Sequence, residues 1–211
     1  MLRTAILVDG FNLYHSLREA ARDNHMSRNG TKWLNISSFC TASMHLINKD
    51  AKINCIHYFS ALAKHIKPQD VHLRHRTFIE ALEYTGVDVH LGRFKSKEVY
   101  CSNCKAYNIR YEEKETDVAI AVMLTRLCLL NETDTVVLIT GDTDIAPAVR
   151  MVKNCCPEKK IWFCFPYKRK NNELVKLSDG HFSMTLKSIR KHQFPDTVNI
   201  GRKTIYKPEK W

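Results

Sequence analysis

Residues 3–15 read RTAILVDGFNLYH, and this stretch decides the fold class of the chain. The apolar run at residues 5–8 shows no polar alternation, which is typical of a strand buried on both faces. Apolar residues at helical spacing follow over residues 13–21, so a helix is expected there. A buried strand that passes directly into a helix predicts an α/β fold in which helices cover the sheet.

The alternation of strands and helices continues along the chain. Further strands are expected at residues 52–59, 87–91, 135–140 and 161–165, and further helices at 38–48, 70–84, 116–130, 144–152 and 172–177. Strands joined by helices imply a central parallel sheet, and right-handed crossovers favour the strand order 3-2-1-4-5. Residues 92–115 are polar and predict a long loop of irregular structure.

The composition is that of an ordinary globular protein, with 44% hydrophobic and 26% charged residues. A chain of 211 residues can bury enough surface to fold without a disulfide or a structural metal. No run of 18 apolar residues occurs, so neither a transmembrane helix nor a membrane partner is expected. The apolar stretch at residues 5–8 is too short for a signal peptide, so we expect a cytoplasmic protein with reduced cysteines.

Positive charge is concentrated near the C-terminus. The formal net charge is +11, and residues 151–211 hold 14 Lys and Arg against 5 Asp and Glu, whereas residues 1–150 hold 19 against 17. We therefore expect a main domain at residues 1–182 followed by a basic extension at residues 183–211. A basic flank fits a polyanion such as nucleic acid, and the alternative is a solvated tail that aids solubility.

The basic extension holds candidate RNA-binding cations, which are Lys187, Arg190 and Lys191. Three aromatic residues are interleaved with the basic ones of this segment: Phe194, Tyr206 and Trp211. Aromatic side chains beside cations can stack on bases, and alternatively they can hold the segment against the body. For Trp211 we favour packing against the body or a contact in a homodimer.

Carboxylates follow the two strands that flank the expected switch point of the sheet. Asp9 directly follows the first strand, and Asp142 and Asp144 follow the fourth. Asp117 opens the helix that leads into the fourth strand, and Asn12 lies close to Asp9. Ligands of such sheets bind outside the carboxyl ends of the strands at this point. Four carboxylates there predict a site for Mg²⁺ or Mn²⁺, and the alternative is that each Asp only caps a helix.

Cys101 and Cys104 form a C-x-x-C, which is the spacing of half a zinc site. The remaining two ligands would have to come from among four histidines, His65, His72, His75 and His90. Two free thiols are an alternative of equal weight. A redox pair is disfavoured because the motif lies inside the expected loop rather than at the start of a helix. The glycine patterns of dinucleotide-binding and P-loop sites do not occur.

Three motifs together resemble those of the NYN domain, a family of the PIN-like nuclease superfamily. They are DGFNLYH at residues 9–15, EEKETDVAIA at 112–121 and LITGDTDIAPAV at 138–149. The resemblance implies a PIN-like three-layer α/β/α sandwich and metal-dependent cleavage of RNA. The resemblance places Asp9, Asn12, Asp117, Asp142 and Asp144 at the positions of the family's acidic site. It also places Lys114 at the position of a family lysine that is expected to contact phosphate.

The sequence leaves open which activity this fold would serve. The leading hypothesis is a ribonuclease acting on single-stranded or structured RNA with Mg²⁺ or Mn²⁺ at the acidic site. The alternatives are a non-catalytic RNA-binding or regulatory module on the same fold and a structure-specific DNA nuclease. Groove shape and contacts to the 2′-OH decide between RNA and DNA, and neither can be read from one sequence.

Overall fold

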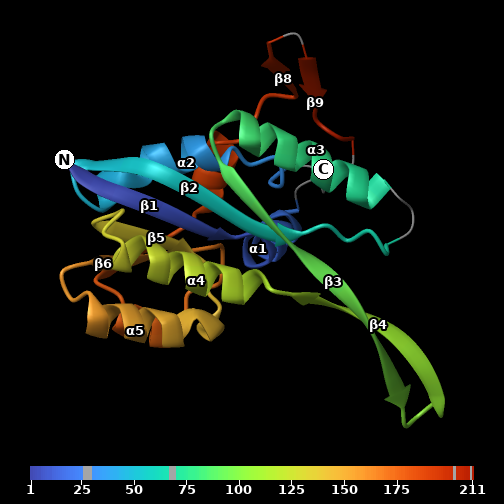
Figure 1. Cartoon of the computed structure of the whole chain (residues 1–211). Coiled ribbons are helices and arrows are strands. Elements are labelled where there is room, and N and C mark those ends of the chain that lie inside the picture. The colour runs from blue at the N-terminus through green and yellow to red at the C-terminus, as the bar shows by residue number, and fades with distance from the viewer. Residues whose placement is uncertain (26–29, 67–69, 202, 210) are drawn as a thin grey trace.

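The computed structural model describes residues 1–25, 30–66, 70–201, 203–209 and 211. Its strands are β1 (Leu2–Asp9), β2 (Ala51–Ala61), β3 (Asp88–Cys101), β4 (Ala106–Lys114), β5 (Thr135–Ile139), β6 (Lys160–Phe165), β7 (Gly180–Ser183), β8 (Thr197–Ile200) and β9 (Lys203–Tyr206). Within these residues, the first seven strands form one sheet in the order β4-β3-β2-β1-β5-β6-β7, and β8 pairs with β9 (Figure 1).

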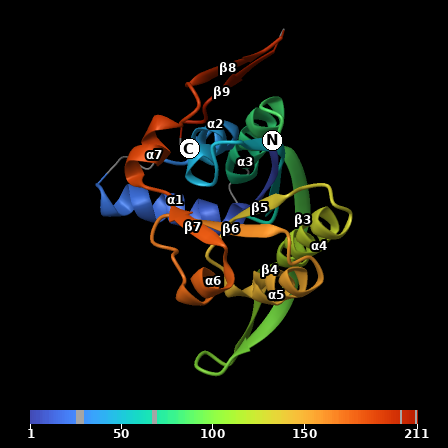
Figure 2. The ribbon, with the colours of Figure 1, turned by 90° about the vertical axis from the view of Figure 1, so that its left-hand side faces the viewer.

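The helices are α1 (Gly10–Asp23), α2 (Ile36–Ser43), α3 (Asp70–Tyr84), α4 (Thr116–Leu129), α5 (Ala146–Cys155), α6 (Asn172–Leu177) and α7 (Leu186–Lys191), with 3-10 turns η1 (Met44–Leu46) and η2 (Thr143–Ile145). Figure 2 shows α1, α2, α3 and α7 on one side of the sheet and α4, α5 and α6 on the other. Among the described helices, none has the length and apolar character that crossing a bilayer requires.

The side chains of β1 explain why both faces of the sheet are covered. Ile6 and Val8 belong to the buried cluster beneath α1, α2 and α3, whereas Ala5 and Leu7 belong to the cluster beneath α4 and α5. All four are at most 1% exposed. Because successive side chains of a strand point to opposite faces, an unbroken apolar run needs a helical layer on each side.

The predicted strand order is confirmed. The expected strands 3-2-1-4-5 correspond to β3-β2-β1-β5-β6, and each neighbouring pair among them is parallel. The sheet is extended beyond the prediction at both edges. β4 joins antiparallel to β3, and β7 joins parallel to β6.

The predicted irregular loop at residues 92–115 is wrong, because β3 and β4 pair from Arg93 opposite Lys114 to Cys101 opposite Ala106. This hairpin, residues 93–114, is called the β3–β4 arm, and Figure 1 shows it projecting away from the body. Residues opposite each other in an antiparallel pair share a face. One face is basic, with Arg93, Lys95, Lys97, Arg110 and Lys114, and the other is aromatic and aliphatic, with Phe94, Tyr100, Tyr107, Ile109 and Tyr111.

Part of the C-terminal segment, described at residues 183–201, 203–209 and 211, packs into the body rather than forming a loose tail, although β8 and β9 project from it (Figure 1). Phe194 and Trp211 are each 5% exposed and belong to the same buried cluster as Val8. The indole N–H of Trp211 donates to the carbonyl of Lys32 at 2.7 Å. The expectation that aromatic residues hold this segment to the body is confirmed for Phe194 and Trp211, but Tyr206 is 69% exposed and makes no such contribution.

We expect replacement of Trp211 by alanine to destabilise the fold. The change removes a buried indole that packs against Tyr14 and Phe78, together with its hydrogen bond to the Lys32 carbonyl. The free energy of unfolding should fall by about 3 kcal/mol, measured by urea denaturation. Tyr206→Ala is the matched control and should change it by less than about 0.5 kcal/mol. Equal stability of Trp211→Ala and the parent would contradict this account of the C-terminal segment.

Candidate active site

Asp9, the last residue of β1, lies at the centre of the candidate site and is 5% exposed. Its Oδ1 accepts the backbone N–H of Asn12 at 2.9 Å, so the carboxylate is the N-cap of α1. Its Oδ2 accepts the hydroxyl of Thr140 at 2.8 Å, from the residue that follows β5. One carboxylate therefore joins the ends of two adjacent strands.

The loop after β5 is held against α1 by a second set of hydrogen bonds. The backbone N–H of Gly141 donates to Asn12 Oδ1 at 3.1 Å, and that of Asp142 donates to Thr140 Oγ1 at 3.1 Å. A Cβ on Gly141 would lie 2.1 Å from the carbonyl oxygen of Arg169, so only glycine fits this close approach. Asp142 Oδ1 then accepts the N–H of Asp144 at 3.1 Å and caps η2.

The third contribution comes from the junction between β4 and α4. Asp117 lies in the first turn of α4, and Glu113 lies near the end of β4. Glu113 Oε1 accepts the backbone N–H of Thr116 at 3.1 Å and also pairs with the Thr116 hydroxyl. Glu115 between them has a φ of 85°, so the chain turns sharply from the arm into the helix. Glu113 was not among the predicted site residues.

The carboxylates of the site repel one another. Burial raises the pKa of Asp9 to about 6. The hydrogen bonds from Asn12 and Thr140 lower this pKa in part, and the charges of Asp117 and Asp142 raise it further. Partial desolvation, together with Asp142, Glu113 and Asp144, raises the pKa of Asp117. The charges of Asp117 and Asp142 therefore act on Asp9, and those of Asp142 and Asp144 act on Asp117.

The donors suit Mg²⁺ or Mn²⁺ in kind, because they are carboxylate and amide oxygens and their repulsion would be relieved by a cation. They do not form a ready cage. Among the described residues, no three Cys, His, Asp or Glu side chains converge closely enough to hold an ion. Both oxygens of Asp9 are engaged by Asn12 and Thr140. Mg²⁺ keeps several of its waters when bound to proteins, so few direct ligands are consistent with this arrangement.

A pocket of about 720 Å³ opens beside the carboxylates. Asp9, Asp117, Asp142 and Glu113 line one part of it. Aromatic side chains line much of the rest, namely Phe11, Tyr14, Tyr58, Phe78, Phe94 and Trp211. Three cations also reach it, Arg18, Lys32 and Arg169. Sequence reasoning missed these cations because they follow no motif and meet only in the folded chain.

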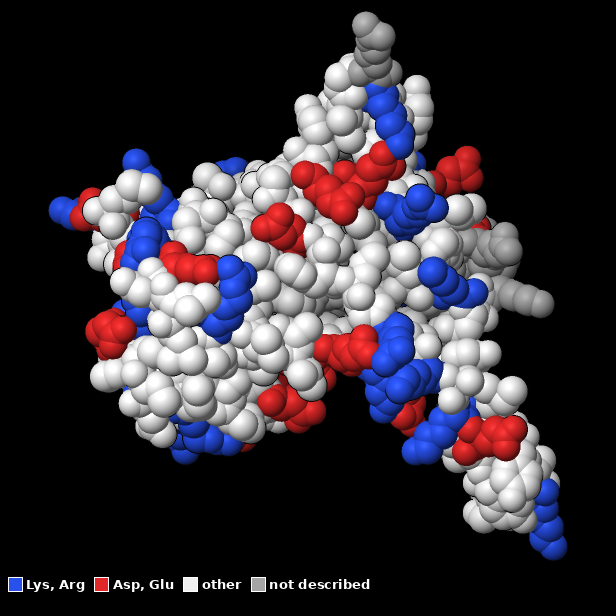
Figure 3. Space-filling model, viewed as in Figure 1, with Lys and Arg blue, Asp and Glu red and all other residues white. Residues whose placement is uncertain are grey.

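The predicted RNA-binding cations do not line this pocket. Lys187, Arg190 and Lys191 lie on α7, which contacts the start of α2 through a hydrogen bond between His192 and Ser38. Lys114 points to the basic face of the arm, where its ammonium pairs with Glu112 at 2.9 Å. Figure 3 shows blue and red side chains side by side along the arm and at its base.

The predicted completion of a zinc site by histidines is not borne out. His90 lies 3.0 Å from His57, His75 approaches Ser60, and His65 stacks on Tyr111. Within the described part of the chain, no such histidine forms a ligand group with Cys101 and Cys104. The reason is topological, because the cysteines lie at the far end of an arm that the sequence did not reveal.

The raised pKa of Asp9 predicts a dependence of stability on pH. Between about pH 4 and about pH 6 the folded protein retains a proton that the unfolded chain releases, so the free energy of unfolding should decrease as the pH rises through this window. The loss should be on the order of 3 kcal/mol. Asp9→Asn cannot ionise and should remove the part of this decrease that comes from Asp9, leaving the part that comes from the raised pKa of Asp117.

Urea denaturation of both proteins with a chelator present measures the effect. Asp50→Asn, at an exposed position before β2, is the control and should keep the parental profile. An unchanged decrease in Asp9→Asn would show that another group titrates.

A solved structure shares this architecture. A crystal structure of a protein of unknown function from Vibrio parahaemolyticus RIMD 2210633 has a TM-score of 0.61 at 17% identity, covering 88% of this chain and 94% of the other. A UDP complex of MnaA from S. aureus covers 91% of this chain and 41% of the other at 13% identity, with a TM-score of 0.39.

A curated relative, 6-hydroxy-3-succinoylpyridine 3-monooxygenase HspA of Pseudomonas putida (strain DSM 28022 / S16), is 28% identical over 116 residues. This match covers 53% of the chain and 36% of the relative. The family model of the NYN domain matches residues 3–192, which is nearly the whole chain and includes every carboxylate of the site. The chain therefore belongs to the NYN domain family, with its PIN-like fold.

Proposed function

We propose that the protein is a ribonuclease that cleaves RNA phosphodiesters at the carboxylate site with Mg²⁺ or Mn²⁺. The observation that supports this most is the convergence of carboxylates from the ends of β1 and β5 and the start of α4, with the pKa of Asp9 raised to about 6. Maintaining such repulsion costs stability, and clusters of this kind are typical of functional sites. The NYN family supports the assignment to nucleases.

The residues have separate roles in this proposal. Asp9, Asp117, Asp142 and Asp144 would hold the cation in part through its bound waters, and the cation would supply a Lewis acid that neutralises charge on the phosphodiester. Asn12 positions the loop after β5 through its bond to the Gly141 N–H. Thr140 orients Asp9 by donating to Oδ2.

The aromatic wall of the pocket suits unpaired bases. Phe94 of the arm meets Phe11 edge to face at 5.8 Å between ring centroids, and His65 lies 4.7 Å from Phe94. Phe11 and Phe94 both line the pocket that the carboxylates share. Aromatic faces next to a site for phosphate provide stacking surfaces for single-stranded nucleic acid.

A second candidate function follows from the same aromatic wall. The Pseudomonas relative is named for action on a hydroxypyridine, and a pyridine ring is as flat and aromatic as a nucleobase. We rank small-molecule oxygenation lower, because a hydroxypyridine ring carries no positive charge that would give a cluster of carboxylates a role.

The first test is cleavage of a pool of single-stranded and structured RNA with Mn²⁺. Asp9→Asn and Asp142→Asn should each lower the rate by about 100-fold or more, because each removes a charge that holds the cation. Asp50→Asn should cleave as the parent does, since this residue precedes β2 and so lies at the opposite end of the parallel strands from the site. EDTA should abolish cleavage by the parent.

The other outcomes are decisive. RNA binding without products that depend on metal would establish a binding module, and cleavage confined to DNA of one structure would establish a DNA nuclease. Parental rates in both Asp variants would refute the proposed site.

The salt dependence of RNA binding tests where phosphates bind. The arm reaches the site through Lys114 and Glu115, whereas α7 packs beside α2. Replacing Lys95 and Arg110 of the arm by glutamine should therefore reduce the salt slope by roughly 0.7 for each phosphate that the arm no longer neutralises. Replacing Lys187 and Arg190 of α7 by glutamine is the matched control and should reduce it less. A larger reduction in the α7 variant would place the RNA on the basic extension instead.

A further inference from the structure

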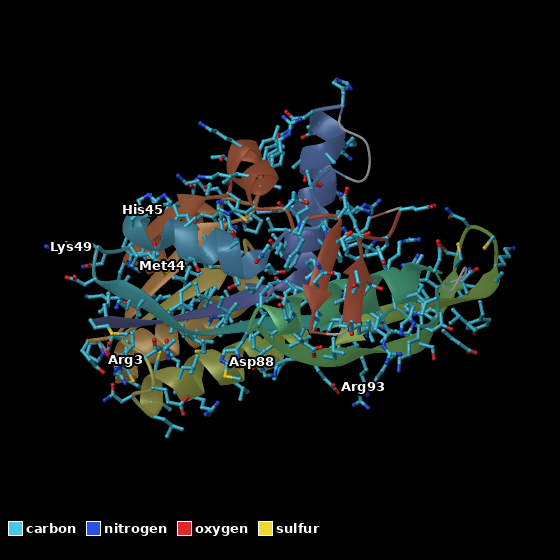
Figure 4. All side chains as sticks on the ribbon, turned by 90° about the horizontal axis from the view of Figure 1, so that it is seen from above. Arg3, Met44, His45, Lys49, Asp88 and Arg93 are labelled. Carbon is cyan, nitrogen blue, oxygen red and sulfur yellow. The ribbon has the colours of Figure 1, made fainter. Side chains whose placement is uncertain are left out.

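The tip of the β3–β4 arm holds two cysteines that the proposed function does not use. Cys101 ends β3, and Cys104 lies in the turn that leads to β4. Both are free thiols, and Cys104 is exposed. Figure 4 shows yellow sulfur atoms at the end of the arm, far from the labelled Arg93 at its base.

The turn is shaped around the sulfur of Cys101. The backbone N–H groups of Asn103 and Cys104 donate to it, as does the thiol of Cys104, and these bonds lower the pKa of Cys101. Lys105, directly after the pair, has a φ of 52°, which an L-residue adopts only at some cost. The turn therefore holds the sulfurs of Cys101 and Cys104 next to each other, as a metal ion bound by both would require.

Two thiolates supply half of a tetrahedral zinc site. Among the described residues, no third Cys, His, Asp or Glu joins them. The nine remaining residues, 26–29, 67–69, 202 and 210, contain none of these four residue types. Because the arm projects from the body, the missing ligands are best supplied by another molecule (Figure 1).

The surroundings of the tip suit contact with an identical surface. Tyr100 is 53% exposed, Tyr107 73% and Ile109 62%. All three lie on the same face of the arm, and the rings of Tyr100 and Tyr107 are 5.3 Å apart. Cys101, opposite Ala106, lies on the other face of the arm, so a two-fold axis at the end of the turn, rather than through the tyrosine face, would bring the two cysteine pairs together. The exposed apolar side chains of the two tips would then lie next to each other.

We propose that the arm tip binds Zn²⁺ jointly with the tip of a second copy of this chain, each copy contributing Cys101 and Cys104. Four thiols then become four thiolate ligands, and their four protons pass to solvent. One ion is shared by two chains, so dimerisation and zinc binding are the same event. The proposal is independent of the ribonuclease assignment.

The experiment measures zinc and mass on the full chain purified in reducing buffer and supplied with ZnCl₂. Mass spectrometry of metals should give one zinc ion per two chains, and light scattering should give a dimer that a chelator converts to a monomer. Cys101→Ser and Cys104→Ser should lose both properties. Cys155→Ser is the matched control, an exposed cysteine at the end of α5, and should keep both, as should Asp9→Asn.

Substitution by Co²⁺ provides a second readout. The visible spectrum should be that of a tetrahedral cobalt site with four thiolates. One zinc ion per monomeric chain would overturn the shared site, and so would a dimer unaffected by either cysteine variant. Failure to retain zinc, with Cys101 and Cys104 recovered as thiols or as a disulfide, would overturn metal binding altogether.

Discussion

The buried carboxylate of Asp9 is the constraint on which the rest of the site depends. It ends the central strand of the sheet, caps α1 and accepts the hydroxyl that follows β5. An ionised carboxylate in this position loses most of its hydration, and two hydrogen bonds compensate only in part, since the pKa remains raised to about 6. The fold thus keeps a group whose charge it disfavours, at the point where three segments meet.

The positions of the neighbouring carboxylates are fixed by different contacts from those that fix Asp9. Asp142 lies in a loop that Asn12 ties to α1, so its position follows from that of β1. Asp117 instead belongs to α4, whose start is fixed by the contact between Glu113 and Thr116. The site therefore depends on the junction between the arm and α4 as well as on the switch point of the sheet.

The sequence predicted the parts of the site that lie at strand ends. Asp9 and Asp142 follow apolar runs that form parallel strands. The carboxyl ends of parallel strands lie at the same edge of a sheet, whatever the conformation of the connecting loops. Thr140 and Arg169 could not be predicted in the same way, because their roles come from contacts between distant segments. The arm was missed for another reason. Its aromatic and aliphatic residues are interspersed with charged and polar ones, and most of its side chains are exposed, so no buried apolar face marked it as a pair of strands.

The β3–β4 arm runs from the turn that holds Cys101 and Cys104 to the junction with α4 beside the carboxylate site. At its base, Arg93 pairs with Glu115 at 2.6 Å, and a Cβ on Gly92 would lie 2.7 Å from the carbonyl oxygen of Lys114. These close contacts leave little freedom between β3 and the turn that begins α4. Asp117 is the second residue of that helix, so the contacts at the base of the arm also help to fix the position of one carboxylate of the site.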